Sequence, residues 1–281
     1  NWECSDGLEE DACGVCGGNN STCTTVSDID GNIYPTVQIG NQNWMAKNLK
    51  VIHYNDGESI EHYSSFQNNN SYINDNYNLV WNNDDDYYYD SYAVKDERGI
   101  CPIGWHVPTV NEYMELLAFI DDDANINIEQ LGLKSELAGE LLKSILNNGS
   151  DTFGFDANSN GYHSVHNNLG WTYSNTDALF WSKTDGYYIH LFTQNNELHL
   201  GNTNQLSNHN SVRCVETIEG CTHPNAINYD NTANVDDGSC EYETVQIGHQ
   251  VWMQENLKAT HYNNGDAIST GLDNQNWGST E

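Results

Sequence analysis

The sequence predicts an α+β fold that is rich in loops, with two helices and short antiparallel strands around them. Three observations support this prediction. Aromatic residues make up 11% of the chain, including eight Trp and 17 Tyr, which is enough for a packed core. Asn–Gly and Asn–Asn steps, which favour turns, recur along the chain. Only two stretches have the spacing of apolar residues that a helix requires.

The first elements are a small cysteine-rich segment and a hairpin. Residues 1–27 are rich in Cys and Gly and are too short to form a core without crosslinks. The main domain begins near Asp28, where turn signals at Gly31 and Gly40 lie on either side of a short apolar stretch. Residues 55–98 are rich in Asn and Tyr and have no clear period, so we expect a surface loop with aromatic anchors.

Helical spacing appears in the middle of the chain. Thr109 and Glu112 form a capping box, and apolar residues then recur every three to four positions, which predicts a helix over residues 109–121. A second helix is expected within residues 134–146. The segments that follow, up to residue 217, have the pattern of short strands between Gly and Asn turns. Two helices surrounded by short strands indicate an α+β fold.

One segment of the chain occurs twice. Residues 36–60 recur 208 positions later, at residues 244–268, and 16 of the 25 aligned positions are identical. Trp44, Asn48 and His53 are among the repeated residues, and we interpret the repeated Trp and His as buried core positions. Self-similarity at a constant offset is the sign of a copied structural unit.

The repeat and the cysteine-rich segments give the expected domain organisation. It consists of a Cys/Gly-rich module at residues 1–27, a main domain at 28–217, a linker module at 218–242 and the N-terminal part of a second domain at 243–281. A hairpin alone is poorly stable, so we expect the last segment to pack on a neighbouring domain or subunit. We interpret the chain as one complete unit and the opening of the next, taken from a longer string.

The charge of the chain excludes some classes of partner. Nine Lys and Arg residues against 41 Asp and Glu residues give a formal net charge of −32. Binding to nucleic acids or anionic membranes needs cations that neutralise phosphates, so neither is an expected partner. There is no apolar run near 18 residues, so no insertion into a membrane is expected. A surface this acidic attracts cations, which makes calcium the candidate cofactor.

Eight cysteines indicate disulfides in an oxidising compartment, and we expect an extracellular or cell-surface location. We pair Cys221 with Cys240, which closes a short loop. The other cluster consists of Cys4, Cys13, Cys16 and Cys23. Four cysteines allow three connectivities, so this pairing stays open, and a zinc site is the less favoured alternative.

Four motifs, in order along the chain, carry a resemblance to a known family. They are NIYPTVQIGNQNWMAKNLKVIHYNDGESI, GICPIGWHVPTVNEYMELL, FWSKT and SVRCVE. Residues 28–217 thus resemble the Fibrobacter succinogenes major paralogous domain, which is found in secreted and surface proteins of bacteria. The motifs are also distantly similar to formylglycine-generating-enzyme and C-type-lectin-like folds, so the resemblance implies a C-type-lectin-like arrangement. It also implies a disulfide between Cys101 and Cys214.

The two cysteine-rich segments have a resemblance of their own. CGVCGGNNSTC and GCTHPNAINYDNTANVDDGSC are similar to Cys-rich repeats of large secreted bacterial proteins, whose Asp-rich loops imply calcium sites. Alternating Asp and Asn with a turn Gly let one loop supply several oxygens to calcium. The candidate ligands are Asp230, Asn234, Asp236 and Asp237. An ordinary Asx turn beside a disulfide is an equal alternative.

A cluster of aromatic residues is the candidate contact surface. It consists of Trp81, Tyr87, Tyr88, Tyr89 and Tyr92, which we expect to be exposed. Tyr and Trp are frequent anchors of protein interfaces, and their flat rings can also stack on sugars. The cluster therefore predicts either contact between subunits or the binding of carbohydrate.

The sequence has no G-x-S-x-G motif, no H-E-x-x-H motif and no phosphate-binding loop. We therefore expect no enzyme, no catalytic residues and no organic cofactor. The favoured function is that of a secreted or cell-surface structural protein of tandem domains, which forms an extracellular fibre or adhesive stalk with neighbouring copies of itself. The alternative is a lectin-like module for adhesion to carbohydrate, for which calcium is a candidate requirement.

Overall fold

The computed structural model describes residues 23–63, 79–81, 86–121, 134–159, 161–164, 170–172, 176–254 and 256. The chain divides into two compact units, Asn1–Glu216 and Thr217–Glu281, which we call the first unit and the second unit. Each is described by itself. No helix among the described residues is long and apolar enough to cross a membrane.

The prediction of an α+β, C-type-lectin-like fold is wrong. The part of the chain that the structure describes is mostly β, with 34% strand, 13% helix and curled antiparallel sheets. One reason is that residues 55–98, expected to be loop, contribute strands, because their aromatic residues suit paired strands once neighbours supply hydrogen bonds. Another is that the second predicted helix is reduced to α3 (Ala138–Leu142). Its expected start, β8 (Lys134–Ser135), pairs instead with a strand of the second sheet.

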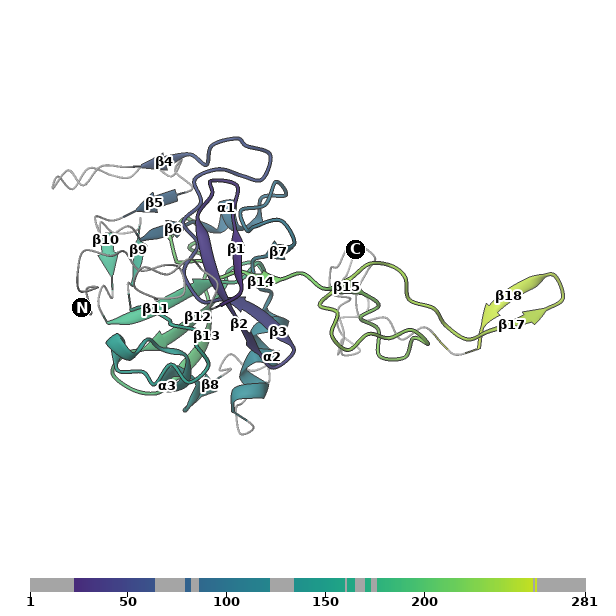
Figure 1. The fold of residues 1–281 in the computed structure, drawn as a ribbon. Coiled ribbons are helices and arrows are strands. Elements are labelled where there is room, and N and C mark those ends of the chain that lie inside the picture. The colour runs from purple at the N-terminus through teal and green to yellow at the C-terminus, as the bar shows by residue number, and fades with distance from the viewer. Residues whose placement is uncertain are drawn as a thin grey trace, which may run out of the picture. The chain divides into compact units, whose positions relative to one another are not determined.

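The first sheet is built around the predicted hairpin. β2 (Ile33–Ile39) and β3 (Gln42–Met45) pair antiparallel across a tight turn. β1 (Thr25–Ser27) pairs with β2 on one side. On the other side, β3 pairs with β14 (Val215–Glu216), which in turn pairs with β7 (Trp105–His106). Strands from the beginning, middle and end of the first unit thus meet in one sheet (Figure 1).

The second sheet contains four antiparallel strands in the order β11–β12–β13–β8. The strands besides β8 are β11 (Asp177–Trp181), β12 (Tyr187–Phe192) and β13 (Leu198–Asn202). Every residue of β11 is buried, so this strand lies in the centre of the core.

Two smaller groups of strands complete the first unit. A three-stranded sheet consists of β4 (His62–Tyr63), β5 (Leu79–Trp81) and β6 (Tyr87–Tyr89). A separate antiparallel pair consists of β9 (Tyr162–Ser164) and β10 (Gly170–Thr172). The short lengths of these strands follow from the frequent turn residues between them.

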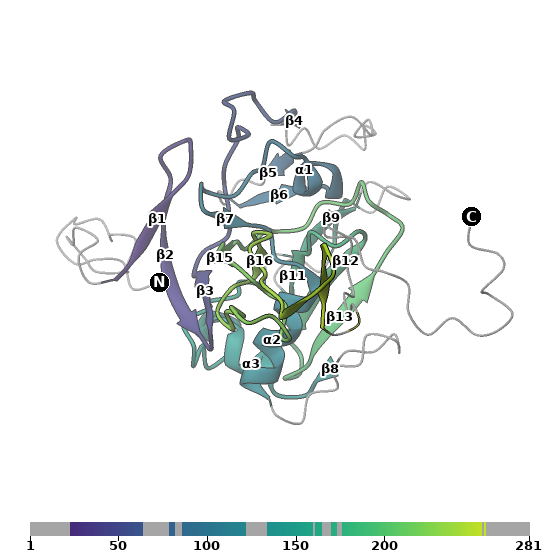
Figure 2. The same ribbon diagram turned by 90° about the vertical axis from the view of Figure 1, so that its right-hand side faces the viewer.

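The predicted first helix and its cap are confirmed. α2 (Val110–Ile120) begins after Thr109, whose Oγ1 accepts a hydrogen bond from the Glu112 amide at 3.3 Å. Oε2 of Glu112 accepts one from the Thr109 amide at 2.8 Å, so two amides at the helix start are satisfied reciprocally. Figure 2 shows α2 between the hairpin β2–β3 and the sheet that contains β11, β12 and β13. α2 buries its apolar side chains against both.

Two clusters of buried apolar side chains fill the first unit. One includes Trp44 from the hairpin, Leu117 from α2 and Ile189 from β12. The other includes the disulfide between Cys101 and Cys214, which the family resemblance implied and the structure confirms. This disulfide joins residues 113 positions apart. By the loop-entropy model, a crosslink over such a length stabilises the fold by about 4–5 kcal/mol.

The second unit contains a connector and a hairpin. In the connector, β15 (Glu219–Gly220) and β16 (Val235–Asp236) pair in parallel. The predicted disulfide between Cys221 and Cys240 is confirmed next to these strands. The hairpin consists of β17 (Thr244–Ile247) and β18 (Gln250–Met253), which are antiparallel.

The structure describes one of the four N-terminal cysteines. Cys23 is disulfide-bonded, which supports the disulfide alternative at this position and not the zinc alternative. Cys4, Cys13 and Cys16 lie outside the described residues, so their pairing stays open.

A buried carboxyl group at the start of a short helix makes the stability of the first unit depend on pH. Asp90 caps α1 (Ser91–Lys95), and its Oδ1 accepts a hydrogen bond from the Ala93 amide at 2.8 Å. Burial raises the pKa of Asp90 to about 6, because the surroundings disfavour the charged form. Between about pH 4 and pH 6 the folded protein therefore holds a proton that the unfolded chain has released.

We expect the contribution of Asp90 to the free energy of unfolding to fall as the pH rises through this window, by roughly 3 kcal/mol in all. Asp90→Asn should remove this pH dependence, because the amide does not titrate. Urea unfolding of both proteins from about pH 4 to pH 7 measures the difference. Burial lowers the pKa of His163 to about 4, which changes the stability with pH in the opposite direction. This effect is the same in both proteins and therefore cancels in the comparison. Equal pH slopes in the two proteins would contradict the prediction.

Candidate functional site

The hairpin of the second unit repeats the hairpin of the first unit in geometry as well as in sequence. Val37 pairs with Trp44 in β2–β3, and Val245 pairs with Trp252 in β17–β18. All four residue pairs of each hairpin have the same register. Both turns contain a glycine with positive φ, 60° in the first and 64° in the second. Because the register is the same, the two hairpins present equivalent side chains on equivalent faces.

In the first unit, the apolar side chains of the hairpin lie in the core. Ile39 is 1% exposed and Trp44 is 0% exposed. The indole of Trp44 stacks on the ring of Tyr113 in α2, with centroids 5.6 Å apart, and lies edge-on to Phe155 at 5.7 Å. The interpretation of the repeated tryptophan as a core residue is therefore confirmed for Trp44.

In the second unit, the equivalent side chains are exposed. Ile247 is 62% exposed and Trp252 is 53% exposed. Full burial of such a side chain stabilises a protein by roughly 1.5–3 kcal/mol, so several large apolar side chains left exposed on one hairpin mark a candidate contact site. This surface is the candidate functional site, and we call it the hairpin surface. It consists of Val245, Ile247, Val251, Trp252 and Met253.

A buried arginine holds the end of the first hairpin in place. Arg213 is fully buried, and its guanidinium donates hydrogen bonds to the carbonyl oxygens of Met45, Phe155 and Asp156. It also donates one to Asn48 Oδ1 at 2.5 Å. Burial lowers the pKa of Arg213 to about 10, so the guanidinium is still charged at neutral pH. The carbonyl dipoles and the Asn48 amide therefore take the place of water around this charge.

The role of Arg213 was missed in the sequence, although one signal for it was present. Asn48 is repeated as Asn256, and an asparagine that recurs in a copied unit marks a required polar contact. Arg213 and Asn48 are 165 positions apart, so spacing could not identify the pair. Asn256 is exposed in the second unit.

Two polar contacts lie at the rim of the first hairpin. Asn43 Nδ2 donates a hydrogen bond to Glu216 Oε2 in β14 at 2.9 Å. Lys47 forms an ion pair with Asp156. Burial alone would raise the pKa of Asp156, but the hydrogen bonds from Lys47 and Ser144 and the charges of Lys47 and Arg213 together outweigh it, so the net pKa shift is downward. Sequence reasoning missed both contacts, because the partners are 173 and 109 positions apart.

The repeated histidine is not a core residue in the first unit. The side chain of His53 is 33% exposed, and its Nδ1 lies 2.5 Å from Asp30 Oδ1. The interpretation of His53 as buried is therefore wrong, because the carboxylate of Asp30 holds the ring at the surface. Its equivalent, His261, lies outside the described residues.

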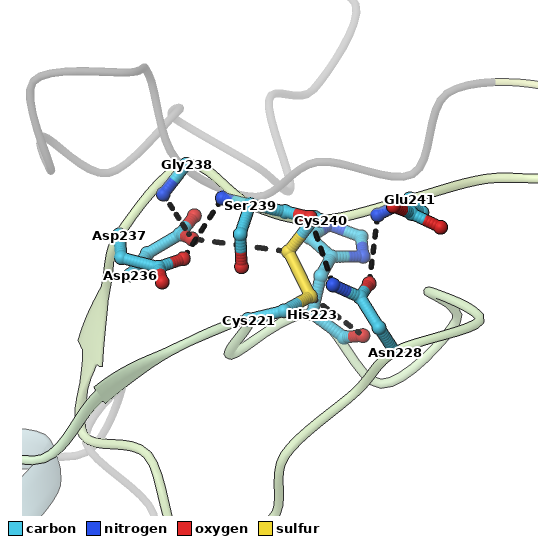
Figure 3. The surroundings of a disulfide bond; sticks show 9 residues. All are labelled: Cys221, His223, Asn228, Asp236, Asp237, Gly238, Ser239, Cys240 and Glu241. Atoms are coloured by element: carbon cyan, nitrogen blue, oxygen red, sulfur yellow. Dashed lines mark hydrogen bonds between the residues drawn. A yellow bond between two sulfur atoms is a disulfide. The ribbon is translucent and has the colours of Figure 1, made fainter.

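Two of the candidate calcium ligands lie beside the disulfide of the connector (Figure 3). Asp236 Oδ1 accepts a hydrogen bond from the Gly238 amide at 3.0 Å. Asp237 Oδ1 accepts one from the Ser239 amide at 2.8 Å. Each carboxylate therefore closes an Asx turn within its own loop, as in the alternative to a calcium site.

The other two candidate ligands also accept hydrogen bonds from residues of the connector. Asp230 Oδ1 accepts hydrogen bonds from the hydroxyl and the amide of Thr232, at 2.6 and 2.9 Å, and these bonds lower the pKa of Asp230. Asn234 Oδ1 accepts one from the Ile218 amide at 2.8 Å. Within the described part of the chain, no three His, Cys, Asp or Glu residues are grouped so that they could hold a metal ion. Calcium binding by this loop stays a prediction.

The expectation of an exposed aromatic cluster is wrong for two of its members. Tyr88 and Tyr89, in β6, are fully buried. The Tyr89 hydroxyl donates a hydrogen bond to the Val51 carbonyl at 2.9 Å, and the Tyr89 carbonyl accepts one from Trp181 Nε1 at 2.7 Å. These contacts place the strand inside the core instead of in a surface loop.

The other members of the cluster do not form one surface. Tyr92 is 54% exposed, and the side chain of Trp81 lies outside the described part of the structure. Tyr87 is partly buried and lines an open hollow of about 190 Å³. The other residues that line the hollow are Ile33, Tyr34, Lys47, Asn48, Leu49, Lys50, Asp86 and Asn158.

Comparison with known protein families gives a match to this chain. A family model described as the Fibrobacter succinogenes major domain (Fib_succ_major) matches residues 37–216, which is more than half of the chain. The match begins within β2 and ends with β14, so it includes most of the first hairpin, α2 and the strand that follows Arg213. No curated protein and no solved structure matches the chain.

The two repeated tryptophans provide a matched test of the site. We expect Trp44→Ala to lower the free energy of unfolding of the first unit by about 3–5 kcal/mol, because it leaves a cavity between α2 and the hairpin. Trp252→Ala should leave the unfolding of the first unit unchanged within about 0.5 kcal/mol, since Trp252 is exposed. Urea unfolding followed by near-UV circular dichroism measures both, and similar losses in the two variants would argue against the assignment.

Proposed function

The chain belongs to the Fibrobacter succinogenes major domain family, and on this premise we propose that it is a non-enzymatic, secreted or cell-surface structural protein made of tandem domains of this family. In this proposal, the first unit contains one domain of the series, and the hairpin of the second unit begins another. Successive domains joined in this way form an extracellular stalk or fibre.

The observation that carries the proposal is the contrast between the two hairpins. Their strands have the same register, yet Trp44 is in a core and Trp252 is half exposed. A two-stranded hairpin with an exposed tryptophan is marginally stable by itself, and burial against a helix and further strands would stabilise it. The simplest partner that fits β17–β18 is a set of elements like those that cover β2–β3 in the first unit.

The connector supports the proposal because it is crosslinked and hydrogen-bonded. The disulfide between Cys221 and Cys240 closes a loop of 19 positions, which stabilises a small module by about 3 kcal/mol in the entropy model. The Asn228 side chain donates to the Ser239 carbonyl at 2.8 Å and accepts from the Glu241 amide at 2.7 Å. A segment tied in this way differs from a flexible Gly/Ser linker and is suited to bearing load between domains. Structural disulfides also fit an extracellular location.

An extension of the chain by its own sequence tests the proposal. At the offset of the repeat, residues 269–281 align with residues 61–73, so a copy of residues 74–216 added after Glu281 would complete a second domain. We expect the amides of β17–β18 to exchange with deuterium at least about tenfold more slowly in the extended chain, because Trp252 becomes buried. Hydrogen-exchange mass spectrometry measures this protection.

The control is the same extended chain with Trp252→Ser, which should stay unprotected because it lacks the side chain that enters the core. The proposal would be refuted by fast exchange of β17–β18 in the extended chain when the added domain itself is folded.

A second candidate function is the binding of carbohydrate, and the hollow beside β6 favours it. Tyr87 is an aromatic residue of its lining, and Lys47, Asp86 and Asn158 line the same hollow with polar groups. Aromatic surface with a few polar groups around it is the usual lining of a small-ligand site. In this alternative, the protein is a lectin-like adhesion module, with calcium a candidate requirement.

A glycan array with and without EDTA tests this alternative. If the hollow binds sugar, Asn158→Ala should weaken binding by about tenfold through the loss of a hydrogen bond, and Tyr87→Ala should weaken it as well. Tyr92→Ala is the matched control, because Tyr92 is exposed but does not line the hollow. An array with no bound glycan, or equal effects of Tyr87→Ala and Tyr92→Ala, would refute carbohydrate binding at this site. Sensitivity to EDTA would separate a calcium-dependent site from a calcium-independent one.

A further inference from the structure

The two hairpins are identical where they enter a core and differ where they meet its rim. Trp44, Met45 and Asn48 are repeated as Trp252, Met253 and Asn256. In the first unit, the first two of these residues are fully buried, and Asn48 accepts a hydrogen bond from buried Arg213. A partner for the second hairpin therefore needs apolar side chains that pack against Trp252 and an arginine that donates a hydrogen bond to Asn256.

The first difference is at the position of Asn43. In the first unit, Asn43 donates a hydrogen bond to the carboxylate of Glu216 at 2.9 Å. The second hairpin has Val251 at this position, and its side chain is 70% exposed. Val251 cannot donate a hydrogen bond. In a core like that of the first unit, it would place two methyl groups against a partly buried carboxylate, which is unfavourable.

The second difference is at the position of Lys47, which forms an ion pair with Asp156 in the first unit. The sequence of the second copy has Glu255 there. A glutamate at the site of Lys47 would replace an attractive pair with two like charges. The differences at the positions of Asn43 and Lys47 therefore act in the same direction, against the core of the first unit as a partner.

We propose that the hairpin surface of the second unit is matched to a family core that differs from the core of the first unit. This inference rests on the proposed function, since it identifies which domain receives the hairpin. In the partner core, an arginine donates a hydrogen bond to Asn256, and aromatic side chains pack against Trp252. Opposite Val251 it has an apolar contact instead of the carboxylate of Glu216. At the position equivalent to Asp156, the partner core has no acidic residue, because an acid there would repel Glu255.

This mismatch has a consequence for assembly. An exposed hairpin that is nearly identical to a core element is a hazard, because it can exchange with that element in another copy and produce uncontrolled domain swapping. Unfavourable contacts at the rim make this exchange less stable. The buried residues of the hairpin still fit a core of the same family. The order of domains in the stalk is then determined by rim contacts, and the partner of β17–β18 is a neighbouring domain and not an identical copy of the first unit.

Transfer of the rim residues into the first hairpin of the full chain tests the inference. We expect Asn43→Val to raise the unfolding equilibrium constant of the first unit by about tenfold, because the bond to Glu216 is lost. Adding Lys47→Glu should raise it further. Asn41→His is the matched control, because it also transfers a residue of the second copy but lies in the exposed turn, and it should change the constant by less than about twofold. Urea unfolding monitored by near-UV circular dichroism gives the constants.

If the double variant does not fold, the reverse change provides the same test. In the chain extended by residues 74–216, Val251→Asn with Glu255→Lys should slow hydrogen exchange of β17–β18 about tenfold further, since the added core is that of the first unit. The inference would be overturned by neutral effects of the rim residues in both experiments. Such a result leaves the proposed function intact as long as β17–β18 is protected in the extended chain. Fast exchange of β17–β18 in the extended chain, with the added domain folded, would instead refute the proposed function.

Discussion

A buried guanidinium needs hydrogen-bond acceptors, and the two terminal nitrogens of Arg213, Nη1 and Nη2, find them on segments that are far apart in the sequence. Arg213 bonds the end of the first hairpin through the Met45 carbonyl and Asn48, and a loop through the carbonyls of Phe155 and Asp156. The next residue along, Cys214, is crosslinked to Cys101. The hairpin, the loop and the last strand of the domain therefore depend on one another, because displacing any of them would leave a charge buried without partners.

The same dependence explains why an almost identical hairpin behaves differently in the two units. In the first unit the hairpin lies between α2 and the rest of the core, and its tryptophan is covered by Tyr113 and Phe155. In the second unit the strands pair in the same register, because register depends on the hairpin alone, but the tryptophan is exposed. Most of the stability of such a hairpin comes from the helix and strands that pack against it. In the function proposed above, such a repeat is a contact element whose specificity lies in the residues at its rim.

Local patterns predicted local structure well. The capping box of Thr109 and Glu112, the first hairpin and the disulfide between Cys221 and Cys240 are all present, since each depends on residues close in sequence. The disulfide between Cys101 and Cys214 followed from the family resemblance. The fold class was wrong because α3 is much shorter than the apolar spacing of its segment predicted: Lys134 and Ser135 pair with β13. Part of the predicted site was also wrong, since Tyr88 and Tyr89 are core residues.

The sequence by itself determined the copied unit, the turns and the capped helix. The tertiary structure decided which partner meets which residue: Arg213 for Asn48, Glu216 for Asn43 and Asp156 for Lys47. The physical reason is that turns, caps and register are satisfied by neighbours within a few residues. Burial of a charge or an aromatic ring is satisfied only by surfaces that folding brings together from distant parts of the chain. The second hairpin shows the same division, since its strands are paired in the same register as those of the first hairpin while its tryptophan is exposed.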